Sequence, residues 1–245
     1  MLTPTMRATT AQEHTMNFNG KNILITGARG NLGRAVAQAF AQAGARVVLL
    51  DRHAAPLPEA GTGHLTLQAD LLDAAQLSEA VAQAVQACGR IDVVCNLAGG
   101  FAMGPGVHET SAEAWNHVFD MNVGTVLNMA RAVVPHMLAA GGGAIVNVGA
   151  NSAARGLAQM SAYCASKDAL ARVTESMSAE LRDQGIRVNA VLPSVLDTPE
   201  NRQAMPDADA ARWVSLDALA DVILFLASDA ARAVQGALLP VVNRA

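Results

Sequence analysis

The sequence predicts an α/β fold in which one domain holds a doubly wound parallel sheet of about seven strands with helices on both faces. Three observations lead to this prediction. Short apolar runs alternate with longer segments of helical period along the 245 residues. The runs are apolar at nearly every position, which is typical of parallel strands covered on both faces. Four of the five helical segments end on glycine, and right-handed crossovers then place helices on both sides of the sheet.

Each expected strand is a short run in which Val, Ile and Leu predominate. In chain order, the strands are expected at NILIT (22–26), RVVLL (46–50), HLTLQ (64–68), IDVVCN (91–96), AIVNVG (144–149), IRVNAVL (186–192) and GALLPVV (236–242).

The expected helices have apolar residues at three- and four-residue spacing. They are expected at 32–44, 74–89, 111–141, 161–185 and 215–229, and the first four end at Gly44, Gly89, Gly141 and Gly185. Residues 197–213, rich in Asp, Pro and Met, are expected to form a long irregular substrate loop that closes over a cofactor as a lid.

The chain is expected to be organised as a leader and one domain. Residues 1–19 are polar and aperiodic, which favours a flexible leader, and Met16 within it is a candidate start. Residues 20–245 contain no linker and no internal repeat, so one domain includes the substrate loop.

The composition excludes several classes of protein. With 51% hydrophobic and 16% charged residues the chain is globular, and its net charge of −4 without a basic block argues against nucleic-acid binding. No apolar run is long enough for a membrane span, and the first residues lack the apolar core of a secretion signal, so we expect a cytoplasmic protein. Three scattered cysteines and six scattered histidines predict neither a disulfide framework nor a metal site.

The stretch ITGARGNLG follows the first expected strand and opens a helix, with Gly27, Gly30 and Gly33 at three-residue intervals. Glycines in this position let backbone N–H groups and a helix N-terminus approach a pyrophosphate. About 20 residues later Asp51 ends the second strand, where a carboxylate accepts hydrogen bonds from a ribose diol and repels a 2′-phosphate. The pattern predicts NAD as cofactor, while Arg29 and Arg52 beside the same position leave NADP as the alternative.

In YCASK, Tyr163 and Lys167 lie four residues apart and therefore project from one face of a helix. Together with the glycine turn, NLAG (96–99) and Asn122 in DMNVGTVLNMA, this sequence resembles the short-chain dehydrogenase/reductase family over about residues 20–243. The resemblance implies a Rossmann-like fold, a small-molecule substrate and a homodimer or homotetramer.

The resemblance also implies roles for individual residues. Tyr163 would donate or accept the proton, Lys167 would bind the nicotinamide ribose and lower the pKa of the tyrosine, and Asn122 would organise a water-linked proton path. Asp70 would contact the adenine ring, and Pro193 and Thr198 the nicotinamide carboxamide. The expected cofactor-binding set is Gly27, Arg29, Asn31, Leu32, Gly33, Asp51, Arg52, Asp70, Leu71, Asn96, Ala98, Gly99, Tyr163, Lys167, Pro193, Val195 and Thr198. As alternatives, Thr198 is a turn residue and Asp70 a helix cap.

The sequence departs from the family pattern at several positions. Asn31 stands where the family's middle glycine would be, Ser194 replaces a glycine, and the usual DGG near the C-terminus is absent. Ala150 occupies the place of the catalytic serine, thirteen residues before Tyr163, so a hydroxyl that polarises a carbonyl is missing there. Ser152 is the candidate replacement, with hydrogen bonding to the local backbone as its alternative role.

Three functions remain in competition. Features shared with dihydropteridine reductases, an alanine at position 150 among them, favour an NADH-dependent reductase of a planar conjugated substrate such as a quinonoid dihydropterin or a quinone. The first alternative is a carbonyl or alcohol oxidoreductase of the 3-oxoacyl or sugar type that uses Ser152. The second is a nucleotide-sensing protein without catalysis. Met103, Met160 and Met205 either line the substrate pocket or fill core and loop. The loop residues that either bind a polar heterocycle or cap the loop are Glu200, Asn201, Arg202 and Trp213.

Overall fold

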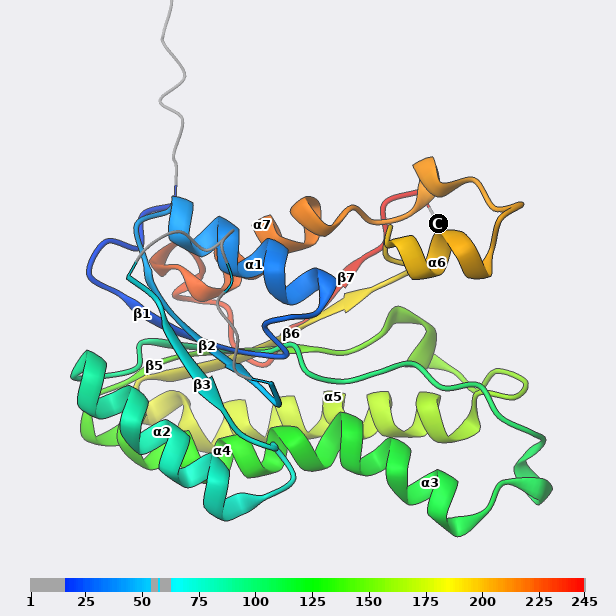
Figure 1. Ribbon diagram of the computed structural model, residues 1–245, viewed down its shortest axis with the longest axis horizontal. Coiled ribbons are helices and arrows are strands. Elements are labelled where there is room, and N and C mark those ends of the chain that lie inside the picture. Colours follow the sequence, from blue (N-terminus) through cyan, green and yellow to red (C-terminus); the bar gives the residue numbers. More distant parts are fainter. Residues whose placement is uncertain (1–15, 54–56, 58–62, 245) are drawn as a thin grey trace, which may run out of the picture.

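The computed structural model describes residues 16–53, 57 and 63–244, which fold around one parallel sheet with the strand order β3-β2-β1-β4-β5-β6-β7 (Figure 1). The strands are β1 (Asn22–Thr26), β2 (Arg46–Asp51), β3 (Leu65–Gln68), β4 (Val93–Asn96), β5 (Gly143–Val148), β6 (Ile186–Pro193) and β7 (Leu238–Val241). All six strand pairs are parallel. The predicted doubly wound fold with seven strands is confirmed.

Helices cover both faces of the sheet (Figure 1). On one face α1 (Asn31–Gln42) packs against α7 (Leu216–Ala227), and α2 (Ala74–Cys88), α4 (Thr125–Ala139) and α5 (Ser161–Leu181) cover the other. Alternate residues of a strand point to opposite faces of the sheet. Ile23 and Ile25 therefore pack into the core on the side of α1 and α7, and Leu24 packs into the core on the side of α2, α4 and α5. Because both layers are apolar, each strand is buried on both sides.

The helix expected over 111–141 is interrupted in the structure. It consists of α3 (Ala112–Phe119) and α4, joined by a π-helical segment at Asp120–Gly124. Hydrophobic spacing does not reveal one extra residue per turn, so the sequence predicted a continuous helix. Such π-helical turns occur frequently at functional sites, and this one contains Asn122.

The loop expected to be irregular over 197–213 contains regular structure, and that part of the prediction is wrong. It forms α6 (Pro199–Ala204) and a 3₁₀ turn at Ala210–Arg212, and a parallel bridge between Leu196 and Val214 closes it. The Thr198 hydroxyl accepts a hydrogen bond from the Asn201 N–H at 3.2 Å and begins α6, followed by a proline that fits the first helical turn.

The expected leader ends earlier than residue 19. Phe18 is 3% exposed, and its ring lies edge-on to Phe40 with 4.9 Å between the ring centroids. Its backbone N–H also donates to the Ala43 carbonyl at 2.8 Å, so this part of the chain belongs to the core. Residues 1–15 lie outside the described part of the chain.

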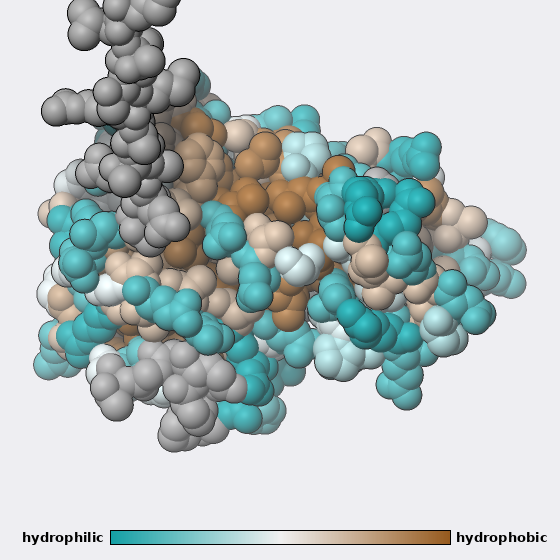
Figure 2. Space-filling view, turned by 90° about the horizontal axis from the view of Figure 1, so that it is seen from above, coloured by the Kyte–Doolittle hydropathy of each residue, from teal (hydrophilic) through white to brown (hydrophobic). Residues whose placement is uncertain are grey.

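The face covered by α1 and α7 carries a band of apolar side chains along its middle (Figure 2). Phe225 of α7 contributes to the exposed apolar surface with 39% of its area accessible. None of the helices within 16–53 and 63–244 is both long enough and apolar enough to cross a membrane.

Candidate active site

The carboxyl ends of the central strands gather the residues expected to bind a dinucleotide. The strand order reverses between β1 and β4, and in open parallel sheets ligands bind outside the carboxyl ends at such a point. β1, β2, β3, β4 and β6 lead into five of the segments on which the sequence placed the cofactor, and α5 carries the sixth with Tyr163 and Lys167.

The glycine turn after β1 has the geometry of a phosphate cradle. Gly27 has a φ of +62°, and a Cβ at this position would lie 2.9 Å from the Cα of Ala98. A Cβ on Gly33 would overlap the Gly27 carbonyl oxygen, whereas one on Gly30 would have room. No side chain caps α1, so the N–H groups of its first turn remain open toward a ligand. The turn therefore fits a pyrophosphate.

Asn31 occupies the position of the family's middle glycine, and its side chain points out of the glycine turn. It is the first residue of α1, and its amide nitrogen donates to the Glu200 carboxylate of α6 at 2.7 Å. Leu32 follows it, half-buried against the core. The Asn31 side chain thus points away from the turn and contacts α6.

Asp51 lies at the end of β2 with its carboxylate held beside the glycine turn. It accepts a hydrogen bond from the backbone N–H of Arg29 at 3.1 Å. Next to it, the exposed Arg52 approaches the Asp70 carboxylate, with 3.7 Å between Nε and Oδ2.

The segment after β3 contains Asp70 and Leu71. The Asp70 carboxylate also accepts from the Leu72 N–H at 2.9 Å, while Asp73 is the residue that caps α2. Leu71 is half-buried, and its carbonyl accepts from Asn128 at 3.0 Å.

Polar residues at the strand ends fix the segment of Asn96, Ala98 and Gly99. The Thr26 hydroxyl accepts from the N–H groups of Leu97 at 3.0 Å and Ala98 at 3.1 Å. Asn96 is 5% exposed and donates to Asn147 at 2.9 Å, and Asn147 donates to Thr174 of α5 at 2.9 Å. Sequence reasoning missed Thr26, Asn147 and Thr174. A polar residue inside an otherwise apolar strand was the available signal for Thr26 and Asn147, whereas Thr174 lies on α5.

Asn122 joins three parts of the site from the π-helical segment. Its side chain oxygen accepts from the Gly100 N–H at 3.0 Å, and its amide nitrogen donates to the Gly100 carbonyl and to Ser166, both at 3.1 Å. Ser166 in turn donates to the Tyr163 carbonyl at 2.8 Å. The amide is thus engaged by protein groups and positions the backbone of Gly100 and α5. Ser166 is a further residue that the sequence analysis missed.

Gly99 marks the place where these groups converge. A Cβ at this position would lie 2.9 Å from the Asn122 side chain oxygen and 3.4 Å from the Lys167 Nζ. Lys167 is 7% exposed and donates to the Val148 carbonyl at 2.9 Å. Burial lowers the pKa of Lys167 to about 8.

Tyr163 lies on the same helix face, one turn before Lys167, and its ring contacts Phe101 edge-on at 5.0 Å. Burial raises the pKa of the phenol to about 12, and the neighbouring Cys164 adds to this shift. The direction is opposite to the lowering expected from the sequence. Desolvation is the largest cause of this shift, because burial disfavours the charged phenolate.

A cavity of about 80 Å³ opens beside Tyr163. Met103 and Met160 line it, as the sequence allowed, whereas Met205 does not. Gln159 also lines it and has a φ of +62°, which is uncommon for a residue other than glycine. Its carbonyl accepts from the Gly104 N–H at 2.9 Å and so ties two walls of the cavity together.

The position of the family's serine contains no hydroxyl, because Ala150 is buried with 6% of its area exposed. Ser152 lies half-buried in a 3₁₀ turn at Asn151–Ala154, and its carbonyl receives the Cys164 thiol at 3.9 Å. The local backbone bond considered for the Ser152 hydroxyl is not formed with any described residue. Ser161 lines the cavity beside Tyr163 and is a further hydroxyl near the site.

The segment after β6 is held by contacts within the protein. Pro193 is buried at the strand end, and the Ser194 hydroxyl donates to the Val242 carbonyl at 3.1 Å. The Val195 carbonyl accepts from the Val214 N–H at 2.9 Å. Around α6, Arg202 forms an ion pair with Asp197, with 2.8 Å between Nη2 and Oδ2, and the Asn201 amide donates to the Leu196 carbonyl. Trp213 is 7% exposed and packs into the protein.

Comparison with known proteins agrees with this geometry. The family model of short chain dehydrogenases matches residues 21–209. D-threitol dehydrogenase of Mycolicibacterium smegmatis is 36% identical over 94% of this chain and 95% of its own length. L-xylulose reductase of Bos taurus is 35% identical over 92% and 96%. Carveol dehydrogenase of Mycobacterium avium, solved in complex with NAD, superposes with a TM-score of 0.82 at 27% identity over 92% and 97% of the two chains. The chain belongs to the short-chain dehydrogenase/reductase family and is an oxidoreductase.

Proposed function

We propose that the protein is an NAD-dependent oxidoreductase that interconverts a secondary alcohol of a small polyol with the corresponding ketone. The observation that carries this proposal is the convergence of Lys167, Asn122 and Gly99 beside Tyr163 at the carboxyl edge of the sheet. The polyol class is supported by the relatives, because a D-threitol dehydrogenase and an L-xylulose reductase both match nearly the whole chain.

The residues of the chain bind the reactants and move the proton. When bound, the nicotinamide takes up or supplies the hydride. Tyr163 would exchange the proton with the substrate oxygen, and its high pKa in the protein keeps the phenol protonated and ready to donate in the direction of ketone reduction. In the direction of alcohol oxidation, the positive charges of Lys167 and of an oxidised nicotinamide would favour the phenolate. Asn122 would hold the backbone between Gly99 and Tyr163 in the required geometry.

NAD rather than NADP is proposed because Asp51 presents a carboxylate where the 2′-phosphate of NADP would lie. Arg52 is directed to Asp70, which reduces its availability for that phosphate. NADH should therefore bind more tightly than NADPH in a fluorescence titration. Equal dissociation constants would contradict the choice of cofactor.

A second candidate function rests on Ala150. Reduction of a quinonoid dihydropterin creates no alkoxide at a carbonyl carbon, so an enzyme for that reaction tolerates an alanine at this position. Under the polyol proposal another group must polarise the carbonyl. The candidates are Ser152, whose carbonyl receives the Cys164 thiol, and Ser161, which lines the cavity beside Tyr163.

The test is a substrate panel with purified protein: four- and five-carbon polyols with NAD⁺, and the matching ketoses, 3-oxoacyl thioesters, quinones and quinonoid dihydropterin with NADH. Turnover on polyols or ketoses is the expected result. Ser152→Ala and Ser161→Ala are then compared, and loss of turnover in one of them identifies the replacement hydroxyl. Turnover confined to the pterin, with both variants active, would replace the polyol proposal by the second candidate. Tight NADH binding without any turnover would favour a nucleotide-sensing protein.

A further inference from the structure

A second and larger cavity, of about 420 Å³, lies at the opposite edge of the sheet. It is built where β1, β4, β5 and β6 begin, together with the turn that follows α7. Its volume falls within the range of roughly 300 to 1,000 Å³ that is typical of small-molecule sites. None of the residues assigned to the candidate active site lines it.

The walls of this cavity are strongly basic in a protein that is acidic overall. Five cationic side chains and two carboxylates line it, an excess of three positive charges, whereas the whole chain carries a net charge of −4. The cations are Lys21, Arg90, Arg182, Arg187 and Arg232, and the carboxylates are Asp92 and Asp229. A concave basic site of this kind concentrates anions.

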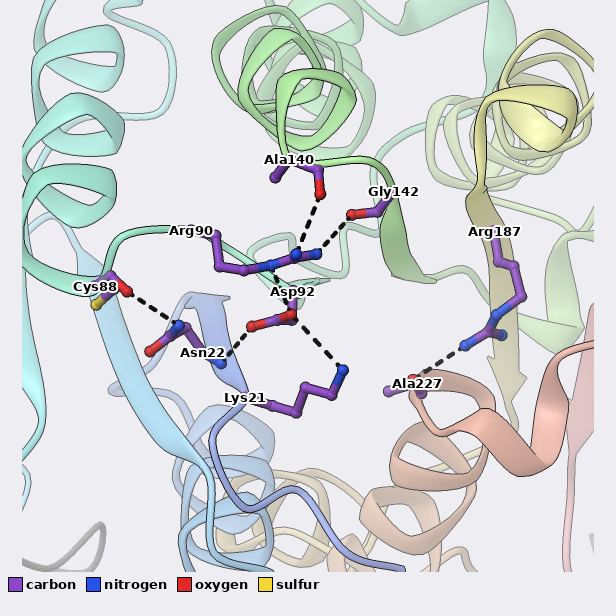
Figure 3. Close-up of polar contacts among 9 residues, drawn as sticks. All are labelled: Lys21, Asn22, Cys88, Arg90, Asp92, Ala140, Gly142, Arg187 and Ala227. Atoms are coloured by element: carbon purple, nitrogen blue, oxygen red, sulfur yellow. Dashed lines mark hydrogen bonds and ion pairs between the residues drawn. The ribbon is translucent and has the colours of Figure 1, made fainter.

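Two of the cations are bound by the fold itself (Figure 3). Arg90 pairs with Asp92, with 2.9 Å between Nε and Oδ1, and donates to the Ala140 carbonyl at the end of α4 at 3.1 Å. Arg187 donates from both terminal nitrogens to carbonyls at the end of α7, among them Ala227 at 3.0 Å and Ser228 at 3.1 Å. Cations are favourable at these helix C-termini, so both arginines have a structural reason to be there.

The other three cations have no comparable partner among the described residues. Lys21 is 3.9 Å from the Asp92 carboxylate, which already accepts from Arg90 and from the Asn22 N–H at 2.9 Å. Arg182 and Arg232 each make one long bond of 3.5 Å, to the carbonyls of Ala179 and Asp229. Most N–H groups of these two guanidinium groups are therefore available to a ligand.

The floor of the cavity is made by backbone in a fixed arrangement. The turn of Gly141, Gly142 and Gly143 packs against Gly185, and a Cβ on Gly142 would overlap the Gly185 carbonyl oxygen. A Cβ on Gly143 would lie 2.7 Å from the Asp92 carbonyl oxygen. This close packing joins the start of β5 to the loop that carries Arg182, so the shape of the cavity does not depend on mobile side chains alone.

We propose that this cavity binds a phosphate-bearing small molecule through Lys21, Arg182 and Arg232. A phosphate monoester carries about −1.5 to −2 charges at pH 7 and three strong acceptor oxygens, which match several cations that line one cavity. Arginine binds phosphate with two parallel hydrogen bonds. The volume exceeds that of a phosphate group, so the remaining space accommodates an organic part of the size of a sugar.

The experiment is calorimetric titration of NADH-saturated protein with inorganic pyrophosphate, so that the nucleotide site is filled and does not contribute. The wild-type protein is compared with Arg182→Gln/Arg232→Gln and with a matched control, Arg131→Gln/Arg172→Gln, which removes the same charge from residues that do not line the cavity. We expect saturable binding to wild type and control, and at least tenfold weaker binding to the cavity variant. Lys21→Gln serves as a second, single-site variant should the double variant not fold.

Two outcomes would overturn the proposal. The first is absence of binding to the wild-type protein, or equal affinity in all variants, because neither is compatible with a site made by these cations. The second comes from the same titration with citrate as ligand. Tighter binding of citrate than of pyrophosphate would contradict the proposal, since a site built for phosphate should not prefer a tricarboxylate. None of these results depends on which substrate the active site uses, so the outcome is independent of the proposed function.

Discussion

Single residues of the active site are governed by burial more than by their charged neighbours. Lys167 is almost fully enclosed, and its pKa falls to about 8, while that of Tyr163 rises to about 12. Both shifts favour the neutral forms, as expected when desolvation is the largest cause. The site therefore contains a protonated phenol and an ammonium group whose pKa is lowered. A cation bound nearby would change both pKa values.

Replacing Tyr163 by phenylalanine tests its role as proton carrier. The variant keeps the ring that contacts Phe101 but lacks the hydroxyl. Loss of a positioned general acid or base should lower kcat by roughly 10²- to 10⁴-fold. The NADH dissociation constant, measured by fluorescence, should stay unchanged. A variant that turns over at the wild-type rate would show that another group transfers the proton.

The pKa of Lys167 predicts how stability varies with pH. Its value of about 8 in the folded protein lies below the ordinary 10.5, so between these values the unfolded chain binds more protons. The contribution of Lys167 to stability is complete above pH 10.5 and is lost as the pH falls through 8. Across this window the unfolding free energy of wild type should rise by about 3 kcal/mol relative to Lys167→Met.

This prediction is measured by urea unfolding at several pH values from 7 to 11. Lys21→Met is the matched control, because it removes the other lysine of the chain, which is exposed. Lys21→Met should follow the wild-type profile. Parallel profiles for wild type and Lys167→Met would mean that the lysine is not desolvated in the folded protein.

At the scale of elements, an exposed hydrogen bond connects α6 to the glycine turn. Glu200 on α6 accepts from Asn31, the first residue of α1, at 2.7 Å. This places a carboxylate at the helix N-terminus where the pyrophosphate of a dinucleotide is expected. A favourable contact in the free protein would then become repulsive when the cofactor binds.

Glu200→Gln removes the negative charge and keeps a hydrogen-bonding side chain. We expect the variant to bind NADH about 2- to 10-fold more tightly at low salt, with a smaller gain at high salt as screening increases. Asp207→Asn, a neutralised carboxylate elsewhere in the same exposed loop, should leave the dissociation constant unchanged. Weaker binding by Glu200→Gln would instead show that the carboxylate helps to hold the cofactor.

At the scale of the whole molecule, the two edges of one sheet carry different chemistry. The carboxyl edge gathers the glycine turn, Asp51 and the Tyr163 cluster, and the amino edge gathers arginines around the ends of α4, α5 and α7. Helix C-termini point to the amino edge in every crossover of a parallel sheet, which favours cations there. The topology thus separates the candidate active site from the basic cavity.

We also propose that the protein is a homodimer or homotetramer. The apolar band on the face of α1 and α7, with Phe225 exposed, is a surface on which copies could associate (Figure 2). Light scattering at micromolar concentration should therefore give two or four times the monomer mass of 25.3 kDa. A monomeric mass at that concentration would contradict the proposal.

The sequence by itself determined the fold class, because the alternation of buried strands and helices is a local pattern that permits few topologies. It also located the glycine turn, Asp51, Tyr163 and Lys167, since each belongs to a spacing that a strand end or one helix face imposes. It did not reveal the π-helical segment at Asn122 or α6, whose geometry depends on contacts with distant segments.

Only the tertiary structure decided the electrostatics and the long-range contacts. The pKa directions of Tyr163 and Lys167 follow from burial, which no spacing in the sequence specifies. The Asn31–Glu200 contact joins residues 169 positions apart, and the basic cavity brings together side chains from β1 to the end of α7. Local patterns determine which elements form, whereas these properties depend on which elements become neighbours after folding.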